Sequence, residues 1–573
     1  MHDLVIRGGS IVDGTGAPSY IGDIAVTDGK IVAVGGAIGA GKQEIDAAGQ
    51  IVCPGFIDTH THYDGQVTWD PYLAPSSWHG VTTVVIGNCG VGFAPCRPDE
   101  REYLCNVMEG VEDIPGSALM EGMSWDWETF PEYLDSLDRQ KRSIDVATQV
   151  PHCAIRTYVM GRDRGLEGEA TADDIAEMAR LSKEAVEAGA VGFSTSRTFI
   201  HLTADGERIP GTSCNPEELV GIAKGMAEGG SAVFQLISDN LGQEPDLAWM
   251  KVIGQTTNRP VIFSLVDLDN SNDPYAFRPT LESLKQTYEQ DGIDIRAAVP
   301  WRSPGFLMGL DTSLHPFSYY KTFKELEGLS LEQIVERMQQ AEFRAAVLAD
   351  GPDMSMSLTG LMNKFEQMFV MTDPPNYEPE PSDSIAARAK AMGISPQELI
   401  YDTMLEQNGT QLLYLPIGGY SEGNLNALHE MLTHSRTTAS LSDAGAHCPS
   451  ICDASFTTFM FTHWVKGRTK GARMQLEEVV RKQTSEPAEL YNLQDRGVIA
   501  VGKKADLNII DFDALYLHTP YLVKDLPAGG KRMLQKADGF KYTIVSGEII
   551  AQDGEMTEAM PGRLIRGPKS VAA

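Results

Sequence analysis

The sequence is poor in basic residues. It holds 47 Lys and Arg against 79 Asp and Glu in 573 residues, which gives a formal net charge of −32 at pH 7. Binding of nucleic acid requires Lys and Arg concentrated against phosphates, so DNA and RNA are excluded as expected partners. An acidic surface of this kind mostly favours solubility.

Long apolar runs are also missing. No stretch approaches the roughly 18 apolar residues that a membrane span requires, and residues 1–10 lack the basic and apolar segments of a signal peptide. Eight cysteines spread over the chain do not form the pattern of a disulfide framework. We therefore expect a cytoplasmic protein without membrane contact, whose cysteines are free thiols or metal ligands.

The two ends of the chain share a β character that the middle lacks. Turn signals such as Asp28-Gly29 separate short alternating segments. We expect one small β-sandwich built from residues 1–54 and 496–573, flanking a domain of residues 55–495. The expected strands of the two ends are 4–7, 9–12, 23–27, 30–34, 44–46, 497–501, 505–511, 541–546 and 548–551.

In the middle, apolar strand-like segments alternate with amphipathic helices. Helices are expected at 172–187, with Thr171 as N-cap, and at 216–228. About eight strand–helix units predict an α/β fold, a closed (β/α)₈ TIM barrel. The interval of about 300–430 exceeds any simple crossover and predicts an insertion or lid over the barrel mouth. After the first barrel strand near 56, the expected strands are 82–86, 145–149, 190–194, 232–237, 260–266, 294–298 and 438–441.

The apolar segment that opens the barrel ends in His60 and His62, separated by one residue. Alternate side chains of an extended strand share a face, so the two imidazoles can converge on one metal ion. The spacing alone is a weak signal, since one histidine could be a core residue and the other exposed.

Two further potential ligands follow other barrel strands. Cys89 comes after 82–86 and Asp443 after 438–441, and the C-terminal ends of barrel strands carry the catalytic groups. Imidazole, thiolate and carboxylate are ligands that zinc accepts, with a position left for water. Cys89 could instead be a small buried residue at a Gly-rich turn, and Asp443 a helix N-cap.

Five motifs are spread over the chain. They are PGFIDTHTHYD at 54–64, HGVTT at 79–83, GNCG at 87–90, Ser442-Asp443 with His447, and GKKADL at 502–507. Together they resemble the amidohydrolase superfamily and, within it, the N-acyl-D-amino-acid deacylase (D-aminoacylase) family, in which the last motif is similar to the return to the β domain. The resemblance covers nearly the whole chain and implies a zinc-dependent hydrolase of an amide bond, with His60, His62, Cys89 and Asp443 around the metal.

The sequence departs from that family at a second metal site. Family members carry two further histidines after the fifth and sixth strands, but here no histidine lies between His201 and His315. The corresponding segments offer Gln235 and Ser264, neutral groups without the basicity of imidazole. We expect one ion, Zn²⁺ with Mn²⁺ or Fe²⁺ as alternatives, and Cys89 either a ligand or a nearby thiol.

One metal ion suffices for hydrolysis, because it lowers the pKa of a bound water to about 7 and polarises a carbonyl. Asp443 would then accept the water proton and deliver it to the leaving amine. His447 could orient substrate or stabilise the tetrahedral oxyanion, or it could be a loop histidine bonded to the backbone.

Substrate recognition is less well defined. Arg197, beside Ser196 at the end of a strand, could pair with a substrate carboxylate, and Arg156 is a weaker candidate. Gln235 and Ser264 complete the expected substrate-binding residues. The family's lysine for the substrate carboxylate is missing, which leaves the N-acyl-D-amino acid specificity open.

Other functions remain open at this stage. The same centre could act on a cyclic amide, a carbamate, an ester or a C–C bond, since these reactions differ in the pocket alone. The chain could also be a non-catalytic relative that acts as a binding protein. The expected partner is a small-molecule substrate, and a homodimer is the expected assembly.

Overall fold

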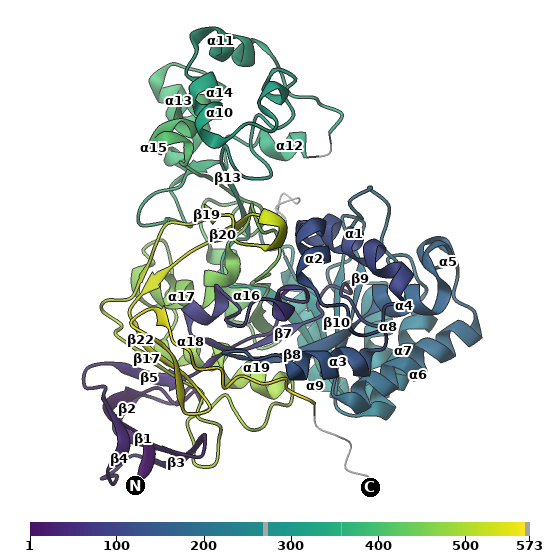
Figure 1. The fold of residues 1–573 in the computed structure, drawn as a ribbon, viewed down its shortest axis with the longest axis vertical. Coiled ribbons are helices and arrows are strands. Elements are labelled where there is room, and N and C mark those ends of the chain that lie inside the picture. Colours follow the sequence, from purple (N-terminus) through teal and green to yellow (C-terminus); the bar gives the residue numbers. More distant parts are fainter. Residues whose placement is uncertain (267–272, 357, 568–573) are drawn as a thin grey trace.

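The computed structural model describes residues 1–266, 273–356 and 358–567 (Figure 1). Within them, eight parallel strands form one sheet in the order β16-β12-β11-β10-β9-β8-β7-β6. The sheet closes where Thr61 pairs with Ala444 and the His62 amide donates to Ala444 O at 2.8 Å. This is the predicted TIM barrel. Its strands are β6 (Phe56–Asp58), β7 (Val81–Ile86), β8 (Asp145–Pro151), β9 (Gly192–Arg197), β10 (Val233–Ser238), β11 (Val261–Ser264), β12 (Ile295–Pro300) and β16 (Thr437–Ser440).

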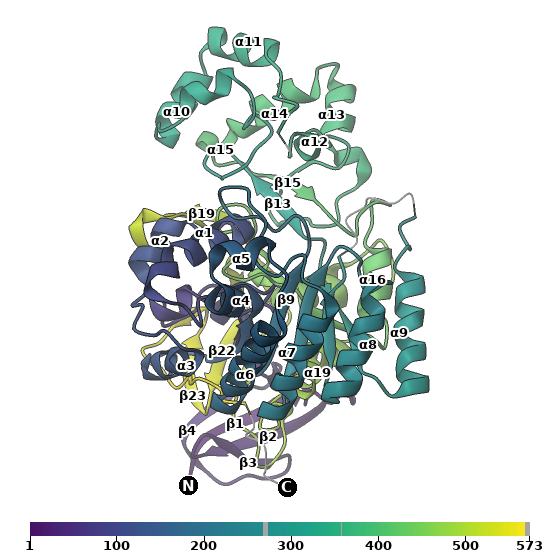
Figure 2. The ribbon, with the colours of Figure 1, turned by 90° about the vertical axis from the view of Figure 1, so that its right-hand side faces the viewer.

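Amphipathic helices cover the outside of the barrel, as the alternation of segments predicts. Helix α6 (Ala172–Ala188) begins where the Thr171 side chain accepts from Asp174 N, so the predicted N-cap is confirmed. The neighbouring helix α7 (Pro216–Gly229) is capped in the same way by Asn215. Figure 2 shows both in a row with α8 (Asp246–Thr257) and α9 (Arg278–Asp291).

The barrel interior has an apolar layer at its base. Val85, Val233 and Ile262 belong to this layer, together with residues of α19 (Ser485–Leu490) that close the base. Residues two positions further along a strand share its face. The next layer toward the mouth therefore contains Gln235 after Val233 and Ser264 after Ile262.

Strands from both ends of the chain join in one nine-stranded sheet of the described residues, which confirms the expected small β domain from both termini. The joint lies where β17 pairs antiparallel with β5. The sheet consists of β1 (His2–Ile11), β2 (Tyr20–Thr27), β3 (Lys30–Val34), β4 (Gly41–Asp46), β5 (Ile51–Pro54), β17 (Leu507–Ile510), β22 (Phe540–Val545), β23 (Glu548–Gln552) and β24 (Glu555–Met556).

The expected strand at 497–501 is wrong. Gly497 and Gly502 bracket this segment with φ of 86° and 90°, in the left-handed region that glycine tolerates, and the segment between them is irregular. Its backbone is still partnered, since Ile499 N donates to Asp13 O at 2.9 Å. The alternating apolar residues of 497–501 therefore lie in a loop between two turns and not in a strand.

The long interval between β12 and β16 folds as a helical lobe with a core of its own, which includes Phe317, Phe343 and Tyr401. A three-stranded sheet of β13 (Gly305–Met308), β15 (Leu413–Pro416) and β14 (Phe369–Val370) connects it to the barrel. Figures 1 and 2 place the lobe on the side of the barrel opposite β1–β4. A lid role for residues 300–430, and the exact domain boundaries, stay predictions. Its helices are α10 (Leu331–Met338), α11 (Ala341–Ala349), α12 (Thr359–Met362), α13 (Ile385–Met392), α14 (Pro396–Met404) and α15 (Glu406–Gly409).

A hairpin of the C-terminal segment reaches the base of this lobe. It consists of β19 (Tyr521–Val523) and β20 (Arg532–Leu534), seen between barrel and lobe in Figure 1. Lys531 Nζ lies 2.5 Å from Asp311 Oδ1, which ties the hairpin to the lobe. Among the helices described, none has the length and apolar character needed to cross a membrane.

Candidate metal centre

Four predicted ligands meet where the barrel closes. His60 and His62 follow β6, Cys89 follows β7, and Asp443 follows β16. The ligand atoms of the two histidines and Cys89 lie within 4.8 Å of one another. Asp443 Oδ1 is 3.2 Å from His60 Nε2 and 3.7 Å from His62 Nε2, and Cys89 Sγ is 3.3 Å from His60 Nε2. The set combines the nitrogen, sulfur and oxygen donors that suit zinc.

The backbone around this centre is held in unusual conformations. Cys89, Asp443 and His447 have φ of 54°, 45° and 47°, a left-handed region that non-glycine residues seldom adopt. Such residues cluster at functional sites, where the surroundings enforce them. Here the Ser442 hydroxyl donates to Asp58 Oδ2 at 2.5 Å and lies 3.0 Å from His60 O, which locks the first and last strands together.

The loop that carries Cys89 is fixed from two neighbouring strands. The Ser194 hydroxyl donates to Gly87 O at 2.5 Å and accepts from Gly90 N at 2.9 Å. The Cys89 amide donates to Gln235 Oε1 at 3.2 Å. The thiol is thus presented to the histidines by hydrogen bonds at both ends of the loop and at its centre.

Charge in the centre is unevenly distributed. Burial lowers the pKa of His60 to about 4. Burial would also lower the pKa of His62, but the charge of Glu112 and the contact with Asp443 raise it well above its ordinary value. Burial would raise the pKa of Asp443, but contact with His62 and the charge of His60 hold it well below its usual range. A positive charge is therefore stabilised at His62, where a metal cation fits.

Glu112 stands behind His62 and was missed by sequence reasoning. It ends α1 (Arg101–Glu112), is 3% exposed, and places Oε1 3.4 Å from His62 Nδ1. A carboxylate in this place fixes the tautomer and orientation of a ligating histidine. The available signal was periodicity, because Glu112 continues the buried stripe of Leu104 and Met108 at steps of four residues.

Two further histidines border the centre. His447 Nε2 lies 3.8 Å from Glu112 Oε2, and the His447 amide donates to Glu112 O. His201, which sequence reasoning also missed, has Nδ1 3.0 Å from Ser196 Oγ. Burial, together with the charges of His62 and His447, lowers the pKa of His201 to about 3, so its ring is neutral. Its only signal was its place shortly after a barrel strand.

The predicted substrate-binding residues differ in their burial and in their hydrogen-bond partners. Ser196 faces His201, and Ser264 Oγ is buried with no hydrogen-bond partner among the described atoms. Arg197 donates to Cys214 O at 2.7 Å and remains 17% exposed at its side chain, so its role stays a prediction. Arg156 is 3% exposed, and its three side-chain nitrogens donate to Gly165 O, Glu218 and Gly168 O. These contacts oppose a role in substrate binding, which stays a prediction.

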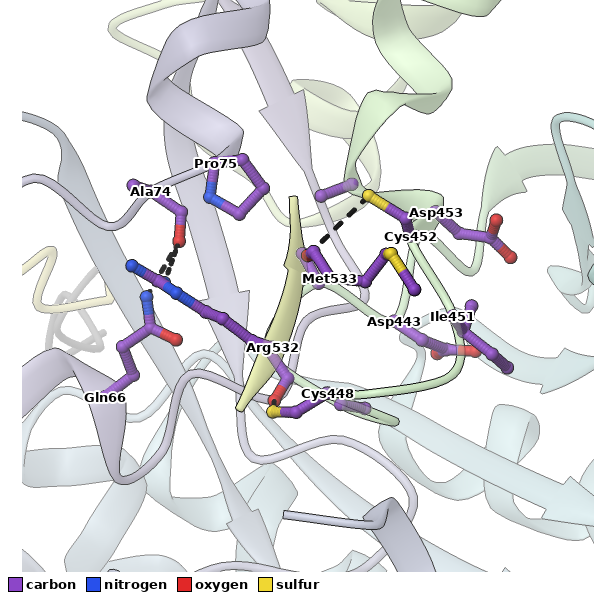
Figure 3. Close-up of a pocket in the computed structure, with 14 residues that line it drawn as sticks. Gln66, Ala74, Pro75, Asp443, Cys448, Ile451, Cys452, Asp453, Arg532 and Met533 are labelled. Atoms are coloured by element: carbon purple, nitrogen blue, oxygen red, sulfur yellow. Dashed lines mark hydrogen bonds between the residues drawn. The ribbon is translucent and has the colours of Figure 1, made fainter. Parts of the chain in front are cut away.

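A pocket opens beside Asp443 (Figure 3). Asp443 and Asp453 lie on one side of it, and Gln66, Ala74 and Arg532 on the other. Arg532 Nη1 donates to Ala74 O at 2.8 Å, so the C-terminal hairpin forms a wall of the pocket. Cys448, Cys452 and Met533 also line the pocket.

A second buried cluster has similar residue types. Ligand atoms of His152, Cys214 and Glu218 also lie within 4.8 Å of one another. His152 Nε2 is 2.8 Å from Glu218 Oε1, and Arg156 forms an ion pair with the other oxygen. Arg197 Nη1 lies 3.3 Å from Cys214 Sγ. Arg156 and Arg197 therefore already supply positive charge to this cluster.

A barrel that gathers nitrogen, sulfur and oxygen donors at its mouth is the framework of a metal-dependent hydrolase. Residues 43–551 match the amidohydrolase family, so the chain belongs to that family. The predicted class, a metal-dependent hydrolase of amide C–N bonds, is thereby confirmed.

Relatives extend over almost the full length. An N-acyl-D-aspartate deacylase of Alcaligenes xylosoxydans xylosoxydans is 27% identical over 98% of this chain and 95% of its own. An N-acyl-D-glutamate deacylase of the same organism is 25% identical over 100% and 98%. A solved D-aminoacylase, described by its binuclear metal centre with one-metal activation and second-metal attenuation, has a TM-score of 0.64 at 22% identity and covers 99% and 100% of the two chains.

Proposed function

We propose that the protein is an N-acyl-D-amino-acid deacylase that works with one metal ion, Zn²⁺ in the first place and Mn²⁺ or Fe²⁺ as alternatives. The observation that carries this proposal is the meeting of His60, His62, Cys89 and Asp443 at the closure of the barrel. Relatives named for deacylation of N-acyl-D-aspartate and N-acyl-D-glutamate support the substrate class.

One ion is favoured by the groups on β10 and β11. Gln235 and Ser264 lie in the layer beneath the mouth and offer no imidazole. The solved D-aminoacylase is described as activated by one metal and attenuated by a second. A single ion held by His60, His62 and Asp443, with Cys89 beside it, agrees with both facts.

When bound, the metal would activate a water molecule and polarise the scissile carbonyl. His60 and His62 would hold it through Nε2, while Glu112 orients the His62 ring from behind. The Asp443 side chain is 30% exposed and borders the pocket, so it can take a proton from the attacking water and give it to the leaving amine. The His447 side chain, 28% exposed beside Glu112, can contact the substrate from the same side.

Other reactions remain as secondary candidates. Hydrolysis of a cyclic amide or a carbamate would use the same groups with a different pocket, and an ester or C–C cleavage is less favoured by the relatives. A purely binding role is opposed by the assembled centre. Cytoplasmic location, a small-molecule substrate and a homodimer stay predictions.

The test is a turnover assay with metal control. The chelated protein is reconstituted with one equivalent of Zn²⁺, Mn²⁺ or Fe²⁺ and given N-acetyl-D- and N-acetyl-L-amino acids, cyclic imides and aryl amides. Release of acetate and free D-amino acid, dependent on metal, is expected. Absence of amine release from every amide at full metal occupancy would show the proposed function to be wrong.

A further inference from the structure

Gln235 is a buried amide in the barrel interior, in the layer beneath the mouth. It is 2% exposed and lies on β10 two residues after Val233, which belongs to the interior apolar layer. Because alternate residues of a strand share a face, the Gln235 side chain also points into the barrel. It meets the loop of Cys89 there.

The orientation of this amide follows from its one recorded partner. Cys89 N lies 3.2 Å from Gln235 Oε1, and a backbone N–H can only donate, so the oxygen must face Cys89. The opposite flip would set two donors against each other. The two hydrogens of Nε2 therefore point elsewhere, and Nε2 has no hydrogen-bond partner among the described atoms.

A buried donor without an acceptor is rare in native proteins and calls for a ligand or an ordered water. The neighbouring strand adds a second such group. Gln235 pairs in register with Ile262, and Ser264 Oγ, two residues further on the same face, is also buried without a partner among the described atoms. Two unpartnered polar groups thus lie on adjacent strands, and one of them, Gln235, contacts the Cys89 loop.

The chemistry of Gln235 Nε2 limits which group can bind there. The lone pair of an amide nitrogen is delocalised into the carbonyl, and Oε1 faces the Cys89 amide, so Nε2 is not suited to ligate an ion. It needs an acceptor. In amide hydrolysis, the acceptor that arises beside the metal is the carbonyl oxygen, which gains negative charge as water adds to the carbon.

We propose that Gln235 Nε2 donates a hydrogen bond to the carbonyl oxygen of the scissile amide and holds the oxyanion of the tetrahedral state, a role that rests on the proposed deacylase function. Water oxygen bonds to the carbonyl carbon, the C–N bond breaks as Asp443 returns the proton to nitrogen, and Gln235 neither gains nor loses a proton. It would replace part of the electrostatic stabilisation that a second cation gives.

The first test is Gln235→Leu in the zinc-loaded enzyme. Loss of one oxyanion donor lowers kcat by about 100-fold or more, because the bond is strongest in the transition state. Zinc stoichiometry should be unchanged and KM should change much less than kcat. The matched control is Gln483→Leu on α18 (Leu476–Gln483), a fully buried glutamine whose amide atoms both lack partners among the described atoms. Its kcat should equal that of the parent.

A second variant separates the donor from the support of the Cys89 loop. Gln235→Glu keeps an oxygen for the Cys89 amide but loses the N–H donors. Its kcat relative to the parent should rise as the pH falls, because a protonated carboxyl regains an O–H donor. A purely structural role would produce no such pH profile. Affinity for a phosphonate analogue of the N-acetyl-D-amino acid should fall in both variants in proportion to kcat/KM.

The outcomes distinguish the two proposals. If the parent deacylates its substrate but Gln235→Leu keeps kcat within about twofold at full zinc occupancy, a buried water satisfies Nε2 and this inference falls alone. If zinc is lost together with kcat, Gln235 only supports the Cys89 loop, and the inference again falls. If Gln235→Leu does not fold, the pH profile of Gln235→Glu decides. A parent without turnover on any amide overturns both proposals.

Discussion

Two buried clusters in this protein contain nearly the same ligand types, yet they differ in what balances their charge. His60, His62 and Cys89 form one, and His152, Cys214 and Glu218 form the other. Among the described residues, the carboxylates of the first, Asp443 and Glu112, pair with histidines. The carboxylate of the second pairs with Arg156 as well as with His152, and its thiol contacts Arg197.

The difference shows that ligand identity and distance do not suffice to define a metal site. A dication added to the second cluster would meet two guanidinium groups in a buried setting, where like charges repel strongly. The first cluster stabilises a positive charge at His62. We therefore interpret the first cluster as a metal centre and the second as a structural ion network.

The largest effect is expected when one histidine of each cluster is replaced by alanine. His60→Ala should abolish stoichiometric zinc binding and lower kcat at least about a thousandfold, because several kcal/mol of metal-derived stabilisation are lost. His152→Ala should keep one zinc per chain. Metal content after dialysis, measured with turnover, makes the comparison.

One outcome of these two substitutions would contradict the assignment of the clusters. If His152→Ala lost zinc while His60→Ala retained it, the assignment of the two clusters would have to be reversed. Circular dichroism of both variants, each beside the parent, confirms that metal loss is not simply unfolding.

The second prediction concerns stability. Glu218→Gln should lower the free energy of unfolding by about 3 kcal/mol, because it leaves the buried Arg156 charge without its partner. Urea denaturation of the zinc-loaded protein measures this. Glu184→Gln, which breaks an exposed pair with Arg180 on α6, is the control and should cost about 0.5 kcal/mol or less. Equal losses in both variants would contradict a structural network.

These two clusters also show where sequence reasoning succeeded and where it stopped. His60, His62, Cys89 and Asp443 could be found because each ends a barrel strand, and strand ends converge by the topology of the fold. The burial of Arg156 against Glu218 could not be predicted, because Glu218 lies on α7 and no local sequence pattern encodes that contact.

The same limit applies to the fold. Alternation of strands and helices predicted the barrel and the β domain of both termini. It could not show that 497–501 is a loop, since the left-handed glycines at its ends are visible only as backbone angles. Glu112 and His201 reach the centre from a helix end and a loop, so their positions are set by tertiary packing.

The third prediction concerns Glu112, which lies behind His62 in the first cluster. Glu112→Gln should weaken zinc binding about 10- to 100-fold, because the residue that orients His62 loses its charge. A competition titration with a chromophoric chelator measures the affinity. Glu109→Gln, one turn earlier on α1, is the control and should bind zinc as the parent does. An unchanged affinity in Glu112→Gln would mean that the His62 ring is oriented without the carboxylate.

The smallest effect is a pH dependence of stability that arises from His152 of the second cluster. Burial lowers the pKa of His152 in spite of its hydrogen bond to Glu218, so the folded protein holds the ring neutral below the unfolded pKa of about 6.5. The unfolded chain then binds more protons, and stability present above pH 6.5 is lost as the pH falls toward the folded pKa. His152→Gln removes this group, so its unfolding free energy should fall less steeply than that of the parent as the pH drops below about 6.5. Urea denaturation at several pH values, with both proteins zinc-loaded so that His60 and His62 keep their ligand state, gives the two slopes. Identical slopes would show that His152 titrates as in the unfolded chain, and would remove the charge argument that separates this cluster from the metal centre.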